Sequence, residues 1–252
     1  MAGKHGLCAA VEGGREALSS LRADEISTLV LLPGMDGTGE LFARFAKELA
    51  PFFALKIIAY PATKPMGYAA LLDLVVGQLP AEGRYAVLAE SFSGPLGIEL
   101  AARAPDRLAK LILCCTFARN PRPSLRALLP LLPLLPMKAV PVSWVGRVLM
   151  GSFFEPELQA DLARAMSQLQ PDVMRARAQA VLEVDVLARL QAIRVPTLYL
   201  QAKRDSLMSP RAADQILAVK PDVQLQKFDG PHFLLQTKPA EAALIVKQFL
   251  ST

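Results

Sequence analysis

The feature that most constrains the fold is a repeated alternation of short apolar runs with longer amphipathic segments, which begins near residue 28. The clearest short run is Leu111–Phe117, which is apolar over nearly its whole length, as in a strand buried on both faces of a parallel sheet. Repeated strand–helix units of this kind favour a mainly parallel sheet with helices on both faces. We therefore predict an α/β fold with about six to eight strands.

The alternation assigns most of the chain to expected elements. The other expected strands are Thr28–Leu32, Leu55–Tyr60, Arg84–Glu90, Thr197–Ala202 and Val223–Phe228. The expected helices are Glu40–Ala50, Tyr68–Leu79, Ser91–Ala104, Pro156–Leu169, Asp172–Val186, Arg211–Val219 and Pro239–Leu250. Residues 1–27 form a poorly defined segment, in which Glu12–Arg22 is a candidate helix.

The alternation stops over residues 118–194, where no segment has a convincing strand pattern. Ala127–Met137 repeats a Leu-Leu-Pro step three times, and proline every third residue forbids a long regular helix. We expect a helical insertion at 118–194 within a core formed by 28–117 and 195–252. Its apolar side chains either pack the insertion onto the core or line an apolar pocket. The candidates for that pocket are Leu132, Leu135, Trp144 and Phe153.

Composition excludes several classes of protein. Hydrophobic residues make up 52% and charged residues 20%, which argues against a disordered chain. The net charge is only +5 and no basic run exceeds two residues, so we expect no nucleic-acid partner. No stretch is long enough to span a membrane and the N-terminus lacks a good signal peptide. The three cysteines, two of them adjacent, are typical of reduced thiols in a cytoplasmic protein.

Ser91 is the strongest candidate for a catalytic residue. It stands where the strand Arg84–Glu90 meets a helix, between the small residues Ala89 and Ser93. A nucleophile on a sharp strand-to-helix turn needs small neighbours, and the helix N-terminus offers N–H groups to a developing negative charge. The alternative is an ordinary serine that caps a helix. Glu90 should point away from the site.

A serine nucleophile needs a base, and the chain has only two histidines, His5 and His232. His232 follows the last expected strand, whereas His5 lies in the N-terminal segment. The acid that orients the imidazole is Asp205, in the loop after Thr197–Ala202, or Asp229, three residues before His232. Asp229 precedes a glycine and is more typical of a turn, which favours Asp205.

These features together resemble the α/β-hydrolase family over residues 28 to 250. The resemblance rests on the loop Pro33-Gly34-Met35-Asp36-Gly37, the turn around Ser91, Asp205 after a strand, and Gly230-Pro231-His232 before the last helix. It implies a Ser91–His232–Asp205 triad, and an oxyanion hole formed by the backbone N–H groups of Met35 and Phe92. It further implies that the insertion is a helical lid, and that the reaction needs no cofactor or metal.

The activity implied is hydrolysis of apolar esters with short- to medium-chain acyl groups. The expected partner is thus a small-molecule ester that reacts at Ser91. Size and triad layout also resemble the biotin-pathway esterases that cleave a methyl ester on acyl carrier protein. An esterase or thioesterase acting on an ester bound to acyl carrier protein is therefore an alternative. Residues 118–194 hold ten basic and six acidic side chains, and this positive charge could steer such an acidic partner. Two other activities stay open: an acyltransferase on the same fold, and a binding protein without catalysis.

Overall fold

A computed structural model describes residues 25–134, 136 and 140–252, so the candidate helix Glu12–Arg22, His5 and Leu135 lie outside the described residues. The described residues contain one parallel sheet of six strands in the order β2-β1-β3-β4-β5-β6. The strands are β1 (Ile26–Leu32), β2 (Ala54–Ile57), β3 (Arg84–Glu90), β4 (Leu108–Cys114), β5 (Thr197–Ala202) and β6 (Gln224–Phe228). The predicted parallel α/β fold is confirmed, at the lower end of the expected strand number.

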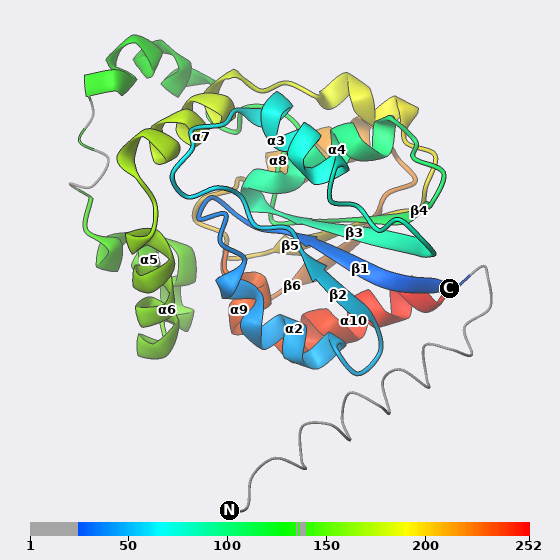
Figure 1. Ribbon diagram of the computed structural model, residues 1–252. Coiled ribbons are helices and arrows are strands. Elements are labelled where there is room, and N and C mark those ends of the chain that lie inside the picture. Colours follow the sequence, from blue (N-terminus) through cyan, green and yellow to red (C-terminus); the bar gives the residue numbers. More distant parts are fainter. Residues whose placement is uncertain (1–24, 135, 137–139) are drawn as a thin grey trace, which may run out of the picture.

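Helices cover both faces of the sheet (Figure 1). One face carries α3 (Tyr68–Val76), α4 (Gly94–Ala102) and α8 (Arg211–Val219), and the other carries α2 (Ala43–Leu49), α9 (Leu234–Thr237) and α10 (Pro239–Ser251). Alternate residues of each strand enter opposite cores, since side chains of a strand point alternately to its two faces. In β3, Val87 belongs to the core beneath α3 and α4, and Leu88 to the core beneath α2 and α10.

Several boundaries differ from the expected ones for local reasons. The strand expected at Leu111–Phe117 begins three residues earlier, at Leu108, and so includes Lys110. The strand can contain this cation because the Lys110 ammonium donates a hydrogen bond to the carbonyl of Phe249 at 2.5 Å. The same strand ends at Cys114, because Cys115 has a left-handed φ of 46°. Cys114 and Cys115 are both buried free thiols. The helices expected at Glu40–Ala50 and Ser91–Ala104 each begin with a 3-10 turn, η1 (Glu40–Phe42) and η2 (Ser91–Ser93).

Between β4 and β5 the described residues form helices and no strand. They are η3 (Pro123–Leu134), α5 (Val142–Met150), η4 (Gly151–Phe153), α6 (Pro156–Ser167), α7 (Pro171–Glu183) and η5 (Leu187–Ala192). Their strand-like pairing is limited to an isolated bridge between Arg119 and Asp185. Figure 1 shows α5 and α6 beside the sheet rather than over either face. We use "helical insertion" for residues 118–194.

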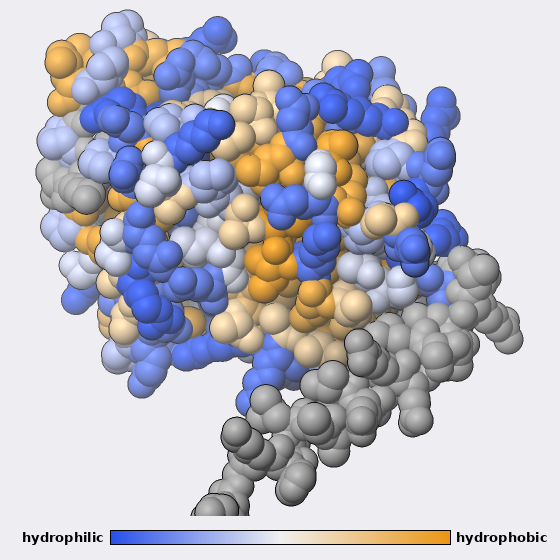
Figure 2. Space-filling model, in the orientation of Figure 1, coloured by the Kyte–Doolittle hydropathy of each residue, from blue (hydrophilic) through white to orange (hydrophobic). Residues whose placement is uncertain are grey.

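The proline-rich part of the helical insertion forms η3, a 3-10 helix, rather than an α-helix. Its leucines divide between two environments. Leu131 and Leu134 are exposed, whereas Leu132 is buried. Figure 2 shows hydrophobic residues on the surface at the corner of the molecule that η3 occupies in Figure 1. None of the described helices is both long and apolar enough to cross a membrane.

Candidate active site

Ser91 is the first residue of η2 and lies on a strained turn directly after β3. Its φ is +50°, a left-handed value that costs an L-residue energy and that occurs mostly where surrounding structure enforces it. Two glycines of α4 permit the close approach that enforces it: a Cβ on Gly94 would overlap Thr116, and one on Gly97 would lie 2.8 Å from the Ala89 Cβ. The Thr116 hydroxyl also donates a hydrogen bond to the Ser91 carbonyl. The turn therefore holds the Ser91 hydroxyl in one place at the carboxyl end of β3.

The structure brings Ser91 of η2 together with His232 and Asp205, which come from the loops after β6 and β5. Ser91 Oγ lies 2.9 Å from His232 Nε2, and His232 Nδ1 lies 2.8 Å from Asp205 Oδ2. The other oxygen of Asp205 accepts the backbone N–H groups of Leu207 and Met208 at 2.8 and 2.7 Å. The carboxylate is thus fixed by its own loop, and its free oxygen orients the imidazole with Nδ1–H toward Asp205 and Nε2 toward Ser91.

Asp229, the alternative acid, lies in a different environment. Its two carboxylate oxygens accept hydrogen bonds from Arg204 at 2.6 and 2.8 Å, and this ion pair is exposed. The Arg204 guanidinium lowers the pKa of Asp229 below its ordinary value. Of the two candidates, it is Asp205 that contacts His232.

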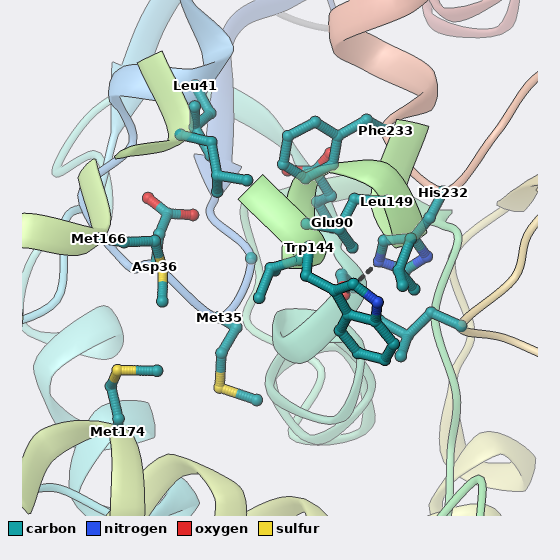
Figure 3. A pocket seen from close by; sticks show the side chains of 16 residues that line it. Met35, Asp36, Leu41, Glu90, Trp144, Leu149, Met166, Met174, His232 and Phe233 are labelled. Carbon is teal, nitrogen blue, oxygen red and sulfur yellow. Dashed lines mark hydrogen bonds between the residues drawn. The ribbon is translucent and has the colours of Figure 1, made fainter. Parts of the chain in front are cut away.

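A mainly apolar cavity of about 320 Å³ opens beside Ser91 and His232 (Figure 3). The polar side of the cavity comes from β3 and from residues 33–37, which we call the oxyanion loop because they contain the predicted oxyanion donor Met35. Apolar side chains of the helical insertion form much of the rest: Trp144, Val145, Val148, Leu149, Leu162, Met166 and Met174. A second cavity of about 190 Å³ also borders Ser91 and includes Phe92, Phe117 and Leu125. Met35, a predicted oxyanion donor, lines both cavities.

The predicted pocket residues have different outcomes. Trp144 lines the larger cavity, with 63% of its surface exposed. Leu132 and Phe153 line neither cavity, which corrects the prediction for both. Leu132 is buried, and its carbonyl accepts a hydrogen bond from Arg175 of α7. Phe153 lies beneath the cations of Arg204 and Lys238. Leu135 lies outside the described residues.

The prediction that Glu90 points away from the site is wrong, since its side chain lines the larger cavity. Strand alternation does not extend through Ser91, whose left-handed φ redirects the chain at this point. Burial raises the pKa of Glu90 from its ordinary value to about 7, and the charge of Asp36 adds to this. A hydrogen bond from Gln236 and the proximity of His232 act in the opposite direction. Glu90 is thus a carboxyl group that titrates near neutrality beside the candidate nucleophile.

Sequence reasoning also missed Arg177, a fully buried cation of α7 that contacts the oxyanion loop. Nothing in the local pattern separates it from the other arginines of α7, because its role depends on a loop some 140 positions away in the chain. Among the described residues, no group of three or more His, Cys, Asp or Glu side chains could hold a metal ion.

Comparisons with known proteins agree with this fold. The model of the alpha/beta hydrolase family matches residues 15–243, so the chain belongs to that family. A curated relative from a Caulobacter species, named "Putative carbamate hydrolase RutD", is 29% identical over 249 residues, which cover 91% of this chain and 92% of the relative.

Solved structures of similar fold include two hydrolases. An enol-lactonase from Burkholderia xenovorans has a TM-score of 0.79 at 19% identity, over 92% of this chain and 94% of its own. A thermophilic esterase from Thermogutta terrifontis has a TM-score of 0.78 at 20% identity, over 90% of both chains. At these identities the two structures establish the shared fold only.

Proposed function

We propose that this protein is a serine hydrolase of carboxylic esters that uses Ser91 as nucleophile, His232 as base and Asp205 as orienting acid. The observation that carries the proposal is the continuous pair of contacts from Ser91 Oγ through the imidazole to Asp205 Oδ2, at 2.9 and 2.8 Å. This pair ends at an apolar cavity large enough for a small acyl or alkyl group.

The geometry supports a two-step reaction. His232 Nε2 takes the hydroxyl proton as Ser91 Oγ attacks the ester carbonyl, and then returns that proton to the leaving alcohol. Water attacks the resulting acyl-enzyme with His232 again as base, which releases the acid and restores Ser91. The backbone N–H groups of Met35 and Phe92 would hold the negative oxygen of each tetrahedral intermediate, and one such donor is worth about 3–4 kcal/mol in comparable sites.

The lining of the cavities favours an apolar substrate. Seven side chains of the helical insertion that face Ser91 across the larger cavity are all hydrophobic. Two cavities adjoin the same hydroxyl, so an ester held at Ser91 has room on both sides of its carbonyl group. We therefore propose esters with short- to medium-chain acyl groups as the substrate class, with the helical insertion serving as the lid of the site.

The Caulobacter relative's name points to carbamates, whose carbonyl a serine can attack in the same way. A small carbamate, however, leaves the hydrophobic side chains around Ser91 without partners, which favours the ester. An ester carried by an acidic acyl carrier protein stays a second candidate, because the helical insertion holds a net charge of +4 from ten basic and six acidic residues.

The test is a substrate panel assayed with wild-type protein and with Ser91→Ala. We expect p-nitrophenyl esters from acetyl to octanoyl to be hydrolysed, with kcat/KM passing through a maximum at an intermediate chain length. Phenyl carbamates and an acyl-carrier-protein methyl ester form the other arms, and added alcohol separates hydrolysis from acyl transfer.

Ser91→Ala should lower kcat by about three orders of magnitude or more, because the residual rate then comes from binding and the oxyanion donors alone. A fluorophosphonate probe should label the wild-type protein and leave the variant unlabelled. A folded Ser91→Ala protein that keeps more than a few per cent of wild-type kcat would exclude Ser91 as the nucleophile.

A further inference from the structure

Arg177 is a charged side chain buried in an unusual place for a cation. It lies on α7 of the helical insertion, and only 1% of its surface is exposed. Its Nη1 donates to the carbonyls of Met35 and Asp36, both at 2.8 Å, and its Nη2 donates to the carbonyl of Pro61 at 3.1 Å. The guanidinium also lies over the ring of Tyr60, 5.7 Å from its centroid. A lid helix thus contacts the backbone of the oxyanion loop directly.

Every carbonyl of the oxyanion loop accepts a hydrogen bond. Pro33 accepts the hydroxyl of Ser93, Gly34 accepts the N–H of Gly37 at 3.1 Å, and Gly37 accepts the N–H of Tyr60 at 2.7 Å. The carbonyls of Met35 and Asp36, in the middle of the loop, are the two that Arg177 holds. Among the described residues, Arg177 is therefore the side chain that hydrogen-bonds to the two central carbonyls of this loop.

A peptide group is planar, so fixing the direction of a carbonyl also fixes the plane that contains the next N–H. The Asp36 carbonyl that Arg177 holds lies in one plane with the N–H of Gly37, and this N–H donates to the carbonyl of Gly34 at 3.1 Å. The Gly34 carbonyl in turn lies in one plane with the N–H of Met35, so the contact with Arg177 is passed on to that N–H. The N–H of Met35 is the proposed oxyanion donor, and its catalytic value depends on its being aimed before the charge develops. A donor that must reorient during the reaction loses much of that value.

The loop is built to accept this cation. Gly37 has a φ of +69°, and a Cβ at this position would lie 2.5 Å from Arg177 Nη1. The side chain of Asp36 is held by Thr38, whose N–H and hydroxyl donate to Asp36 Oδ1 at 2.9 and 2.6 Å. Burial lowers the pKa of Arg177 from its ordinary value, and the charge of Asp36 opposes that effect. Burying a guanidinium is costly unless its donors are used, and here Nη1 donates to two carbonyls of the loop and Nη2 to that of Pro61.

We propose that Arg177 is a positioning residue that fixes the oxyanion loop so that the N–H of Met35 is aimed at the intermediate formed on Ser91. The inference rests on the proposed hydrolase function. It assigns to the helical insertion a second task besides walling the cavity, since one of its helices sets the geometry of the donor on which the chemistry depends.

The test compares Arg177→Met and Arg177→Lys with Arg175→Met, a control on the same helix. Arg175 also donates to a backbone carbonyl, but to that of Leu132 in η3 rather than to the carbonyls of Met35 and Asp36 that Arg177 holds. Rates are expressed per active site, counted by fluorophosphonate titration, so loss of folded protein does not enter. We expect Arg177→Met to lower kcat by about ten- to a hundredfold, a fraction of the loss known for removing a donor outright. KM should change by less than about threefold, and Arg177→Lys should lie between Arg177→Met and the wild type.

An alkyl trifluoromethyl ketone gives the readout that a merely structural residue would not affect. It forms a tetrahedral adduct with a serine nucleophile, so its affinity should fall by the same factor as kcat in the Arg177 variants. In Arg175→Met both quantities should stay within about twofold of wild type. Wild-type kcat per active site in Arg177→Met, with only a lower Tm, would overturn the inference.

If instead Ser91→Ala retains activity, the proposed function fails. That outcome is distinct from wild-type kcat in Arg177→Met, which overturns the inference about Arg177 alone.

Discussion

The sheet core and the helical insertion face each other across Ser91 and contribute different kinds of groups. The core supplies polar atoms fixed by backbone contacts, such as Asp205, whose carboxylate is held by two N–H groups of its own loop. The insertion supplies hydrophobic side chains such as Met166 and Met174, flexible residues that fill irregular space. We therefore expect the sheet core and the helical insertion to respond differently to substitution. Changes in the core should affect every substrate alike, and changes in the insertion should affect the choice among substrates.

Side chains of the sheet core are also more completely buried than those of the helical insertion. Leu88 and Leu113 of the central strands are completely buried, whereas Trp144 of α5 is largely exposed although it lines the cavity. The insertion has a small core of its own, formed by Met150, Leu158 and Leu162 against Phe233. Arg177 adds a polar contribution from the insertion, since it comes from α7 but holds two backbone carbonyls of the core beside Ser91.

Among the substitutions considered, Asp205→Asn in the core should cause the largest loss of kcat. An amide at this position can still accept the N–H groups of Leu207 and Met208, but its NH₂ group would face His232 Nδ1. The imidazole would then carry its proton on Nε2 and could not accept one from Ser91. We expect kcat to fall by about 10³–10⁴-fold for all esters of the panel.

The control for this prediction is Asp229→Asn, which disrupts an exposed ion pair with Arg204 and should change kcat by less than about twofold. Steady-state kinetics on a short and a longer ester measure both variants. Equal losses from the two substitutions, or a loss at Asp205 confined to one chain length, would contradict the division between core and insertion.

The core could be predicted from sequence because its signals are local. β3, β5 and α8 have the bounds that hydrophobic periodicity indicated, and Ser91 and His232 lie where a strand ends and a loop follows. Short apolar runs buried on both faces leave few alternatives to a parallel sheet. The elements that shifted did so through tertiary contacts, as where Lys110 meets the carbonyl of Phe249.

The insertion could not be predicted to the same depth. Leu132 and Phe153 have the composition of pocket residues, but which hydrophobic side chain faces a cavity depends on how short helices pack, and no local period encodes that. Glu90 and Arg177 were missed for a related reason: the turn at Ser91 overrides strand alternation, and the partners of Arg177 lie in a loop far away in the chain.

Glu90→Gln should change how stability depends on pH. The pKa of Glu90 is raised to about 7 from an ordinary value of 4.5, chiefly by burial. Between these two values the folded protein binds more protons than the unfolded chain, so the free energy of unfolding falls as pH rises, by up to about 3 kcal/mol. The variant lacks this titration and should gain stability over wild type above pH 7. Urea unfolding at a series of pH values from about 5 to 9 measures the slope.

The matched control is Glu82→Gln, an exposed carboxyl that should leave the pH slope unchanged. Asp36 and His232 also face Glu90 and remain in both variants, so the difference between the two slopes isolates Glu90. Parallel curves for wild type and Glu90→Gln would mean that the Glu90 carboxyl does not titrate in this range.

Gly94→Ala should disturb the turn that carries Ser91. The new methyl group would overlap the side chain of Thr116, which holds the Ser91 carbonyl. Overpacking of this kind costs about 1–3 kcal/mol, and kcat should fall equally for short and long esters. Adding Thr116→Ala removes the two nearest overlapping atoms, Oγ1 and Cγ2, and should restore part of the stability, which thermal unfolding measures. A double variant no more stable than Gly94→Ala would exclude this contact as the cause.

The smallest effect should come from Trp144→Ala, which tests the insertion side of the comparison. The indole lines the cavity with much of its surface in water, so its removal opens no sealed core and should leave Tm nearly unchanged. A longer acyl chain loses a hydrophobic partner worth about the burial of one CH₂ group, roughly 0.8 kcal/mol, whereas an acetyl group is too short to reach it. We expect kcat/KM for a hexanoyl ester to fall about fourfold relative to that for the acetyl ester, while Leu134→Ala, at an exposed leucine outside the cavity, changes neither. Equal losses on both esters would place Trp144 with the residues of the core, and the division of labour between the two regions would fail.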